Sequence, residues 1–388
     1  LIVAFALGFV YLLDSLVVSF PKGVPFDSFD YYGTSNIWVT FYAICILVGA
    51  IVSYLIASHN AHKAGYSKSY FEPILYVGFP AGIVGGRIWW VISEWNRSLA
   101  DRHTFMDVIN IRGGGLAIQG GVILGALAGI WIMREFRRDM SLFDAFDYII
   151  PGILIAQAIG RYGNFFNIEV YGAATDPAKW WFLPKVFITH TQALDGSYYV
   201  PLFLIESCAN ILGFFVITKL FGGVLKKFMV KGDQGYLYFV WYGIVRVVME
   251  PLRDAEFIMG TSVQMSIAFI VVGLLLIVCN HLYDFMYRKN KEKINQGFDN
   301  FKVKLSALAS KFESMPKYVR ILLALPIIDG FAYGYYRFTK GHFYTGILHI
   351  IFGSTILWVV DLLGVLLDTP LLFTRDFTLK RENKIQNV

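Results

Sequence analysis

Residues 262–286 read SVQMSIAFIVVGLLLIVCNHLYDFM, an almost continuous apolar run that is long enough to cross a membrane. A transmembrane helix needs about 20 predominantly apolar residues, because each residue rises only about 1.5 Å along the helix. Comparable runs precede it at about 38–58, 70–93, 114–133, 146–165, 201–221 and 235–251, and two more follow at about 319–337 and 343–367. This pattern predicts an all-α integral membrane protein.

The composition excludes a soluble protein of this size. Of the 388 residues, 56% are hydrophobic and only 16% are charged, whereas about 25% of a soluble domain is charged. The 36 glycines and 34 phenylalanines exclude a disordered chain. The three cysteines lie inside apolar runs and the seven histidines are scattered. We therefore expect no disulfide framework, no metal site and no cofactor.

Basic residues in alternate loops predict the orientation of the chain. Such residues follow the first, third, fifth and seventh runs: His59, His62, Lys63, Lys68, Arg134, Arg137, Arg138, Lys219, Lys226, Lys227, Lys231, Arg288, Lys289, Lys291 and Lys293. By the positive-inside rule these loops are cytoplasmic, so residue 38 lies outside and residue 288 inside, with seven spans between. The net charge of +6 then reflects orientation and anionic lipid, and no nucleic-acid partner is expected.

The chain divides into four expected parts. The apolar start, residues 1–19, could be a further span, a signal-like segment or the cut edge of a longer sequence, and its length favours a span. Residues 20–286 form the seven-span body. Residues 287–317 are polar with apolar residues at three- and four-residue spacing, which predicts an amphipathic linker helix on the cytoplasmic surface. Residues 318–388 form a two-span hairpin and a basic tail.

Polar residues inside the spans are the first functional signal, because an ionisable side chain is costly in a bilayer. These residues are Tyr42, Arg87, Gln119, Arg161, Asn164, Asn167, Glu169, Arg246 and Glu250. In the predicted topology all of them lie toward the outer leaflet, which favours one polar cavity opening there. A single arginine near a span end could equally reach the headgroups and do nothing else. Arg246 and Glu250 are four residues apart on a helix, so they can pair.

Glycine is the second signal. Residues 113–121 read GGGLAIQGG. We interpret Gly125 and Gly129, further along the same span, as sites where helices approach closely. Gly113, Gly114 and Gly115 stand at the start of the span, where glycine lets backbone N–H groups approach an anion such as a phosphate.

The third signal is GRYGNFFNIEVYG at residues 160–172. Asn164, Asn167 and Glu169 can orient the guanidinium of Arg161 and leave it able to bind a phosphate in bidentate fashion. This stretch closely resembles the signature of bacterial prolipoprotein diacylglyceryl transferases. The resemblance extends to RGGGLAIQGGVILGALAG at 112–129, YGIVRVVMEPLRD at 242–254 and FYAICILVGA at 41–50, and it covers about residues 20–286.

The resemblance implies an activity and a set of roles. The family transfers diacylglycerol from phosphatidylglycerol to the lipobox cysteine thiol of a preprolipoprotein, which forms a thioether and releases glycerol phosphate. It implies a multi-pass protein of the bacterial cell membrane whose site faces the outer leaflet. The roles it implies are phosphate binding and polarisation by Arg161 and Arg246, support by Asn164, Glu169 and Glu250, loop shape from Gly172, and the early family tyrosine at Tyr42. Arg87, Asn167, Gly114 and Gly115 are expected to join the lipid site.

One position departs from the family pattern. The family usually carries a histidine where this chain has Gln119, and an amide cannot accept the thiol proton. Either the proton goes elsewhere, with Glu169, Glu250 and water near the headgroups as candidate acceptors, or the histidine is not a base in the family.

The segment after the linker resembles small two-span hairpin modules. Asp361 in this segment could be a functional carboxylate or could pair locally, and we favour local pairing. Two other functions stay open at this point, a membrane transporter for an anionic solute and a non-catalytic lipid-binding or scaffold protein. The sequence shows no paired repeat between its halves, which argues against the transporter.

Overall fold

The structure is a computed structural model that describes residues 41–94, 108–109, 115–167, 170–189, 196–254, 262–353, 357–369, 371 and 374. The N-terminal segment 1–19, Gly114 and Glu169 lie outside the described residues, as does the side chain of Asn167. Among the described residues, five helices are long and apolar enough to cross a membrane: Tyr42–Lys63, Ile74–Glu94, Leu142–Phe166, Leu202–Val224 and Ser262–Glu313. They coincide with five of the predicted runs, as an all-α membrane protein requires.

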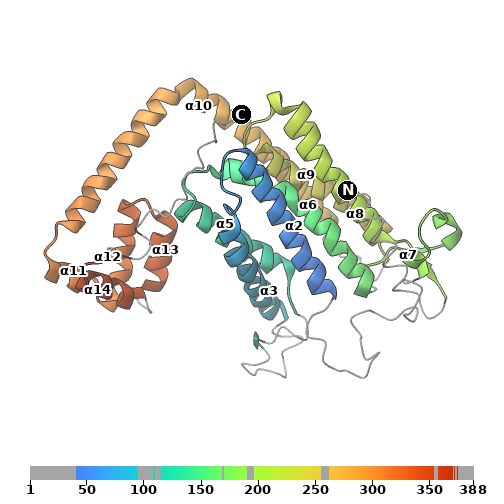
Figure 1. The fold of residues 1–388 in the computed structure, drawn as a ribbon, viewed down its shortest axis with the longest axis horizontal. Coiled ribbons are helices and arrows are strands. Elements are labelled where there is room, and N and C mark those ends of the chain that lie inside the picture. The colour runs from blue at the N-terminus through green and yellow to red at the C-terminus, as the bar shows by residue number, and fades with distance from the viewer. Residues whose placement is uncertain are drawn as a thin grey trace. The chain divides into compact units, whose positions relative to one another are not determined.

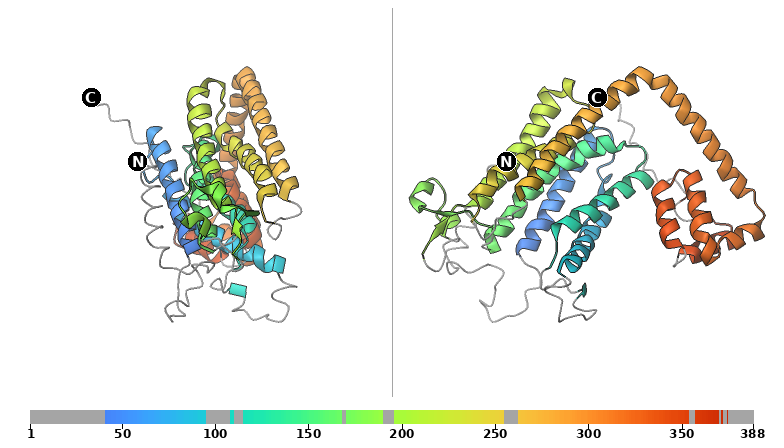
Figure 2. Two further views of the ribbon diagram at one scale, coloured as in Figure 1. Left: turned by 90° about the vertical axis from the view of Figure 1, so that its right-hand side faces the viewer. Right: turned by 180° about the vertical axis from the view of Figure 1, so that it is seen from behind.

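The chain folds as two compact units, Leu1–Ala64 with Phe143–His281 and Gly65–Leu142 with Leu282–Val388. The first unit is a bundle whose helices run side by side (Figures 1 and 2). Its members are α2 (Phe41–Lys63), α6 (Leu142–Asn167), α8 (Leu202–Phe215) with its continuation η4 (Val216–Val224), α9 (Asp233–Met249) and the start of α10 (Ser262–Glu313). Small residues let α2 and α6 meet closely, since a Cβ on Gly49 would lie 2.9 Å from the carbonyl oxygen of Ala156.

A short irregular region connects α6 to α8. It contains η3 (Pro177–Trp180), α7 (Val186–Thr189) and an antiparallel pair of two-residue strands, β1 (Ala174–Thr175) and β2 (Tyr198–Tyr199). The prediction of an all-α fold did not include this ladder. It forms because backbone groups outside the helices still need hydrogen-bond partners, and here the two ends of the connection supply them to each other.

The second unit begins with a tightly packed helix pair. The segment η2 (Ile74–Gly78) with α3 (Phe79–Glu94) packs along α5 (Ile118–Glu135). A Cβ on Gly120 would overlap the carbonyl oxygen of Gly85, and a Cβ on Gly125 would lie 3.4 Å from that of Gly78. The predicted close approach is therefore confirmed at Gly125, whereas Gly129 faces only the side chain of Ile74.

We expect Gly120→Ala to lower the free energy of unfolding by about 1–3 kcal/mol, because the added methyl group must push two backbones apart. Gly129→Ala is the matched control, since its Cβ would meet the Ile74 side chain at an ordinary 3.7 Å. Thermal unfolding of both variants in lipid tests this. Equal melting temperatures for Gly120→Ala and the unchanged protein would contradict the packing argument.

The rest of the second unit is the distal part of α10 followed by α11 (Lys317–Leu323), α12 (Pro326–Thr339), α13 (Phe343–Phe352) and α14 (Trp358–Leu366). The predicted run 319–337 is divided, because Pro326 starts a new helix and the residue before it, Leu325, is extended at φ −72° and ψ 150°. The 14 residues of α12 rise about 21 Å, less than the roughly 30 Å of a hydrocarbon core.

Candidate active site

The guanidinium of Arg161 lies near the end of α6, held between two acceptors. It donates from Nη1 to Oδ1 of Asn164 at 3.1 Å, and from Nη2 to Oε1 of Glu206 on α8 at 2.5 Å. The arginine side chain keeps 22% of its surface exposed, whereas that of Glu206 is only 3% exposed. Asn164 and Glu206 therefore orient the guanidinium, and the exposed part of the Arg161 side chain can still contact a ligand.

Glu206 is a site residue that the sequence analysis missed. It stands inside the predicted apolar run 201–221, and an ionisable residue in a span is itself a functional signal. The same criterion that selected Arg161 would therefore have found it. A charge this deeply buried needs a partner, and Arg161 supplies one.

Aromatic packing fixes α8 against α6 around this ion pair. The rings of Phe165 and Phe203 lie 4.7 Å apart, and each also contacts Phe187 at about 5.5 Å. Ser207 on α8 donates to the carbonyl oxygen of Ala158 on α6 at 3.0 Å. These contacts hold the carboxylate of Glu206 at the level of Arg161.

Tyr42 reaches the same end of α6 from α2. Its ring lies over Gly163, where a Cβ would come within 2.5 Å of the tyrosine Cδ2. Glycine at position 163 is thus what allows the ring of Tyr42 to pack against α6 at this point. Tyr42 itself is half-buried.

A second charged centre forms where α9 ends and η6 (Glu250–Leu252) begins. The carboxylate of Glu250 lies 3.4 Å from Arg246 Nη2 and 3.4 Å from Arg253 Nε, and all three side chains are nearly buried. Arg246 also donates to Oγ of Ser262 at 3.2 Å. The predicted pairing of Arg246 with Glu250 is confirmed. These three side chains together carry one more positive than negative charge, an arrangement suited to an anion.

Gly172, the last residue of the signature, lies beside this second centre. It forms an antiparallel bridge with Arg253, and the N–H of Ala173 donates to the carbonyl oxygen of Leu252 at 3.0 Å. A Cβ on Gly172 would lie 2.8 Å from that same oxygen, so only glycine fits. Val170 has a positive φ of 55°, a strained conformation for a β-branched residue. The signature therefore begins at the first centre and ends at the second.

Three other predicted site residues belong to the second unit. Arg87 is buried and donates from Nε to the carbonyl oxygen of Val108 at 2.7 Å and from Nη1 to that of Gly115 at 3.0 Å. Gly115 has a φ of +80°, and a Cβ there would overlap the ring of Trp90. The described contacts of Arg87 thus hold the glycine-rich segment in place. Gln119 is exposed in the first turn of α5.

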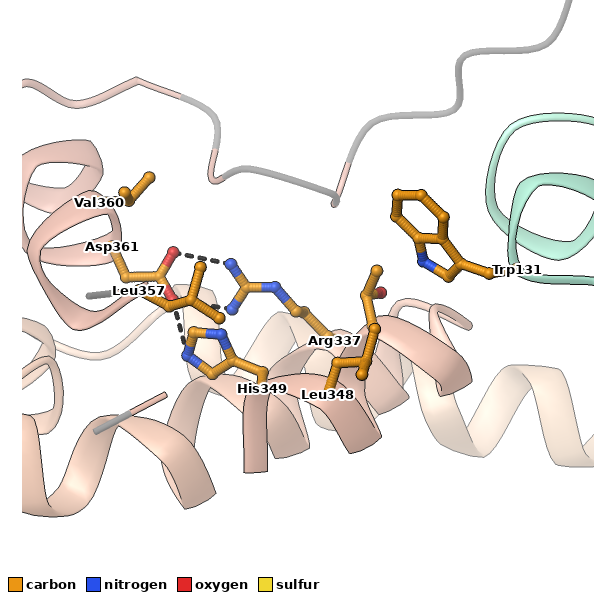
Figure 3. A pocket seen from close by; sticks show the side chains of 8 residues that line it. Trp131, Arg337, Leu348, His349, Leu357, Val360 and Asp361 are labelled. Carbon is orange, nitrogen blue, oxygen red and sulfur yellow. Dashed lines mark hydrogen bonds and ion pairs between the residues drawn. The ribbon is translucent and has the colours of Figure 1, made fainter. Parts of the chain in front are cut away.

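The second unit also contains a buried charged cluster in the C-terminal helices (Figure 3). Asp361 accepts from Nη1 and Nη2 of Arg337 at 2.8 and 2.7 Å, so its predicted local pairing is confirmed. His349 Nε2 lies 2.6 Å from Asp329 Oδ2 and 3.1 Å from Asp361 Oδ2. Asp329, His349 and Asp361 present three ligand atoms within 4.8 Å of one another. Arg337 already engages both oxygens of Asp361, so this carboxylate has a protein cation as its partner.

Comparison with known proteins identifies the chain's relatives. The model of the family described as prolipoprotein diacylglyceryl transferase matches residues 33–279. A protein named phosphatidylglycerol–prolipoprotein diacylglyceryl transferase from Streptococcus agalactiae serotype Ia is 34% identical over 260 residues, which cover 66% of this chain and 94% of that protein. Proteins of the same name from Malacoplasma penetrans and Streptococcus pyogenes serotype M5 are 32% and 35% identical, covering 68% and 62% of this chain and 83% and 90% of theirs.

No solved structure matches the chain significantly. The family match spans both charged centres and most of the sequence, and the relatives are covered almost end to end. The chain belongs to the prolipoprotein diacylglyceryl transferase family.

Proposed function

We propose that the chain transfers the diacylglyceryl group of phosphatidylglycerol to the lipobox cysteine thiol of preprolipoproteins, the reaction named for its relatives. It is a membrane transferase of lipoprotein biosynthesis. The observation that carries the proposal is the pair of arginine centres at the two ends of the signature, Arg161 with Glu206 and Arg246 with Glu250 and Arg253. Fixed guanidinium groups in a water-poor site are suited to a lipid phosphate.

The chemistry follows from these charges. The thiolate sulfur attacks the glycerol carbon that bears the phosphate ester, the new S–C bond forms, and the C–O bond breaks with its electron pair leaving on glycerol phosphate. Negative charge grows on the phosphate oxygen as it leaves, and a positioned guanidinium lowers the barrier by stabilising that charge. The thiol proton must go to a base, for which Glu169 and Glu250 are the proposed acceptors because Gln119 offers no basic nitrogen.

The remaining roles complete this proposal. Asn164 and Glu206 orient Arg161, and Glu250 orients Arg246. Arg87 acts through the glycine-rich segment, whose Gly114 and Gly115 are proposed to contact the lipid, and Asn167 is proposed as a further lipid-binding residue. Tyr42 and Gly172 shape the two ends of the site.

The proposed topology has seven spans over residues 20–286 and a site open to the outer leaflet of the bacterial cell membrane. It is supported by the alternating loop charges and by helices at each predicted run from α2 to α10. Residues 318–388 are proposed as an accessory two-span hairpin. His342 from this part pairs with Glu135 of α5, and both side chains are 2% exposed. That buried pair ties the extension to the family core.

The activity is tested by incubating the purified protein in lipid with a lipobox peptide and phosphatidylglycerol, and weighing the peptide. We expect the mass of one diacylglyceryl group to be added, and glycerol phosphate to appear in equal amount. A peptide in which serine replaces the lipobox cysteine is the control and should stay unchanged. Unmodified cysteine peptide together with solute flux in liposomes would support the transporter instead.

A further inference from the structure

The distal part of α10, residues 291–313, exposes an apolar face. Ile294, Phe298, Phe301 and Leu308 recur at three- and four-residue spacing, and between 42% and 58% of each is exposed. The face continues to Phe312, where it becomes the core that packs against Tyr333 of the C-terminal helices. About four helical turns of apolar surface therefore lie open on one side of the helix, whereas the other sides are mostly polar apart from Val303.

Lysines border this face on both sides. At about 100° per residue, Lys291 and Lys302 lie along one edge, and Lys293, Lys304 and Lys311 lie along the other. The acidic residues of the helix's middle, Glu292 and Asp299, lie on the opposite side. Lys302 Nζ lies 4.8 Å from the ring centroid of Phe298, so a lysine stem already follows the edge of the apolar face.

This distribution distinguishes a membrane surface from a protein partner. A helix lying in a lipid interface keeps its apolar face in the acyl boundary, while flanking lysines extend outward to anionic headgroups. Acidic groups must then point away from the lipid, as Glu292 and Asp299 do. Both edges carry the same sign of charge, which complements a uniformly negative surface.

Helix α10 also has a break at Asn290, which is where it must change direction if residues 291–313 are to lie along the membrane surface. Asn290 departs from helical geometry at φ −118° and ψ 19°, and its side-chain amide donates to the carbonyl oxygen of Met286 at 3.1 Å. The apolar part of α10 ends just before, at Arg288 and Lys289. A break supported by a side-chain hydrogen bond lets one helix change direction without an intervening loop.

We infer that residues 291–313 form an interfacial helix that binds the anionic phospholipid surface of the leaflet beside Arg288. Ile294, Phe298 and Phe301 enter the acyl boundary, and the bordering lysines contact the headgroups. The helix thereby anchors the C-terminal helices at the membrane and gathers anionic lipid around the protein. This inference is independent of the transfer reaction.

The test compares spin labels on opposite sides of the helix in the full chain, with Cys45, Cys208 and Cys279 replaced by alanine. Phe298→Cys labels the apolar face, and Val303→Cys, which is 66% exposed on the other side, is the matched control. In nanodiscs of phosphatidylglycerol and phosphatidylcholine, we expect the label at 298 to be several-fold more accessible to oxygen than to a water-soluble nickel complex. The label at 303 should show the reverse.

The requirement for anionic lipid is tested in two ways, by changing the lipid composition of the discs and by removing lysine charges from the helix. In phosphatidylcholine alone the contrast between the two labels should fall several-fold. Replacing Lys291, Lys293, Lys302 and Lys304 with glutamine should do the same in the mixed discs, since each lysine near an anionic surface changes binding about fivefold.

Three outcomes would overturn the inference. One is equal nickel access at 298 and 303 in the mixed discs. Another is shielding of 298 from both oxygen and nickel, in discs and in detergent, which would mean that protein covers the face. The third is a difference in access between the labels at 298 and 303 that stays the same when phosphatidylglycerol is left out of the discs. If the Phe298→Cys variant does not fold, a spin label on Phe301→Cys reports on the same apolar face.

Discussion

Arg161→Ala is expected to lower diacylglyceryl transfer by at least about a hundred- to a thousandfold, the range seen when one fixed charge stabiliser is removed from a transition state. The guanidinium is oriented by Asn164 and Glu206 and keeps 22% of its surface exposed, so its loss removes the charge that we propose stabilises the leaving phosphate. Mass measurement of a lipobox peptide over time, with phosphatidylglycerol in excess, gives the rate.

The control must separate catalysis from folding. Arg161→Ala leaves the buried carboxylate of Glu206 without its guanidinium partner, and breaking a buried pair costs about 3–5 kcal/mol. The double variant Arg161→Ala with Glu206→Gln removes both charges, so we expect its melting temperature to recover while transfer stays lost. Recovered transfer in the double variant would show that Arg161 only neutralises Glu206. Near-normal transfer in Arg161→Ala would contradict its role outright.

Asp361→Asn is expected to lower the stability of the C-terminal helices by about 3–5 kcal/mol, because it breaks a fully buried ion pair. Asp361 is 0% exposed, and both of its oxygens accept from Arg337 while His349 contacts one of them. An asparagine keeps the shape but removes the charge that balances Arg337. Hydrogen exchange of α12 to α14 in the full chain measures the local loss.

Asp368→Asn is the matched control for this substitution. Asp368 is 67% exposed and pairs with an exposed Lys317, so its replacement should change stability far less than that of Asp361, because solvent screens an exposed pair. Equal exchange in the two variants would mean that the buried cluster does not stabilise these helices. Because the family match ends at residue 279, we expect transfer to persist in both variants.

Helical spacing made part of the candidate site predictable. Arg246 and Glu250 are four residues apart and Arg161 and Asn164 are three apart, so each pair shares a helix face whatever the rest of the fold does. The structure contains both contacts. Arg253 is also three residues from Glu250, but α9 has ended and Pro251 lies between them, so helical spacing alone did not predict this contact, which depends on the η6 turn.

Other features needed more than spacing. The run 319–337 has the composition of one span, yet Pro326 divides it, a local signal that hydrophobicity alone does not weigh. The β1–β2 ladder joins residues more than twenty positions apart. Which residues pair in this ladder depends on the path of the connection between α6 and α8, and that path brings its two ends together.

The sequence alone determined the class of protein and the places of its helices from α2 to the start of α10. A bilayer forces each spanning segment to satisfy its own backbone hydrogen bonds, and that requirement is local, so apolar runs reveal it. Only the tertiary structure decided the acidic partner of Arg161. Arg161 and Glu206 are 45 residues apart, and the helices that carry them meet through the packing of phenylalanine rings and small residues. Unlike the pairing of Arg246 with Glu250, this pairing acts between helices, and the spacing along one helix does not contain it.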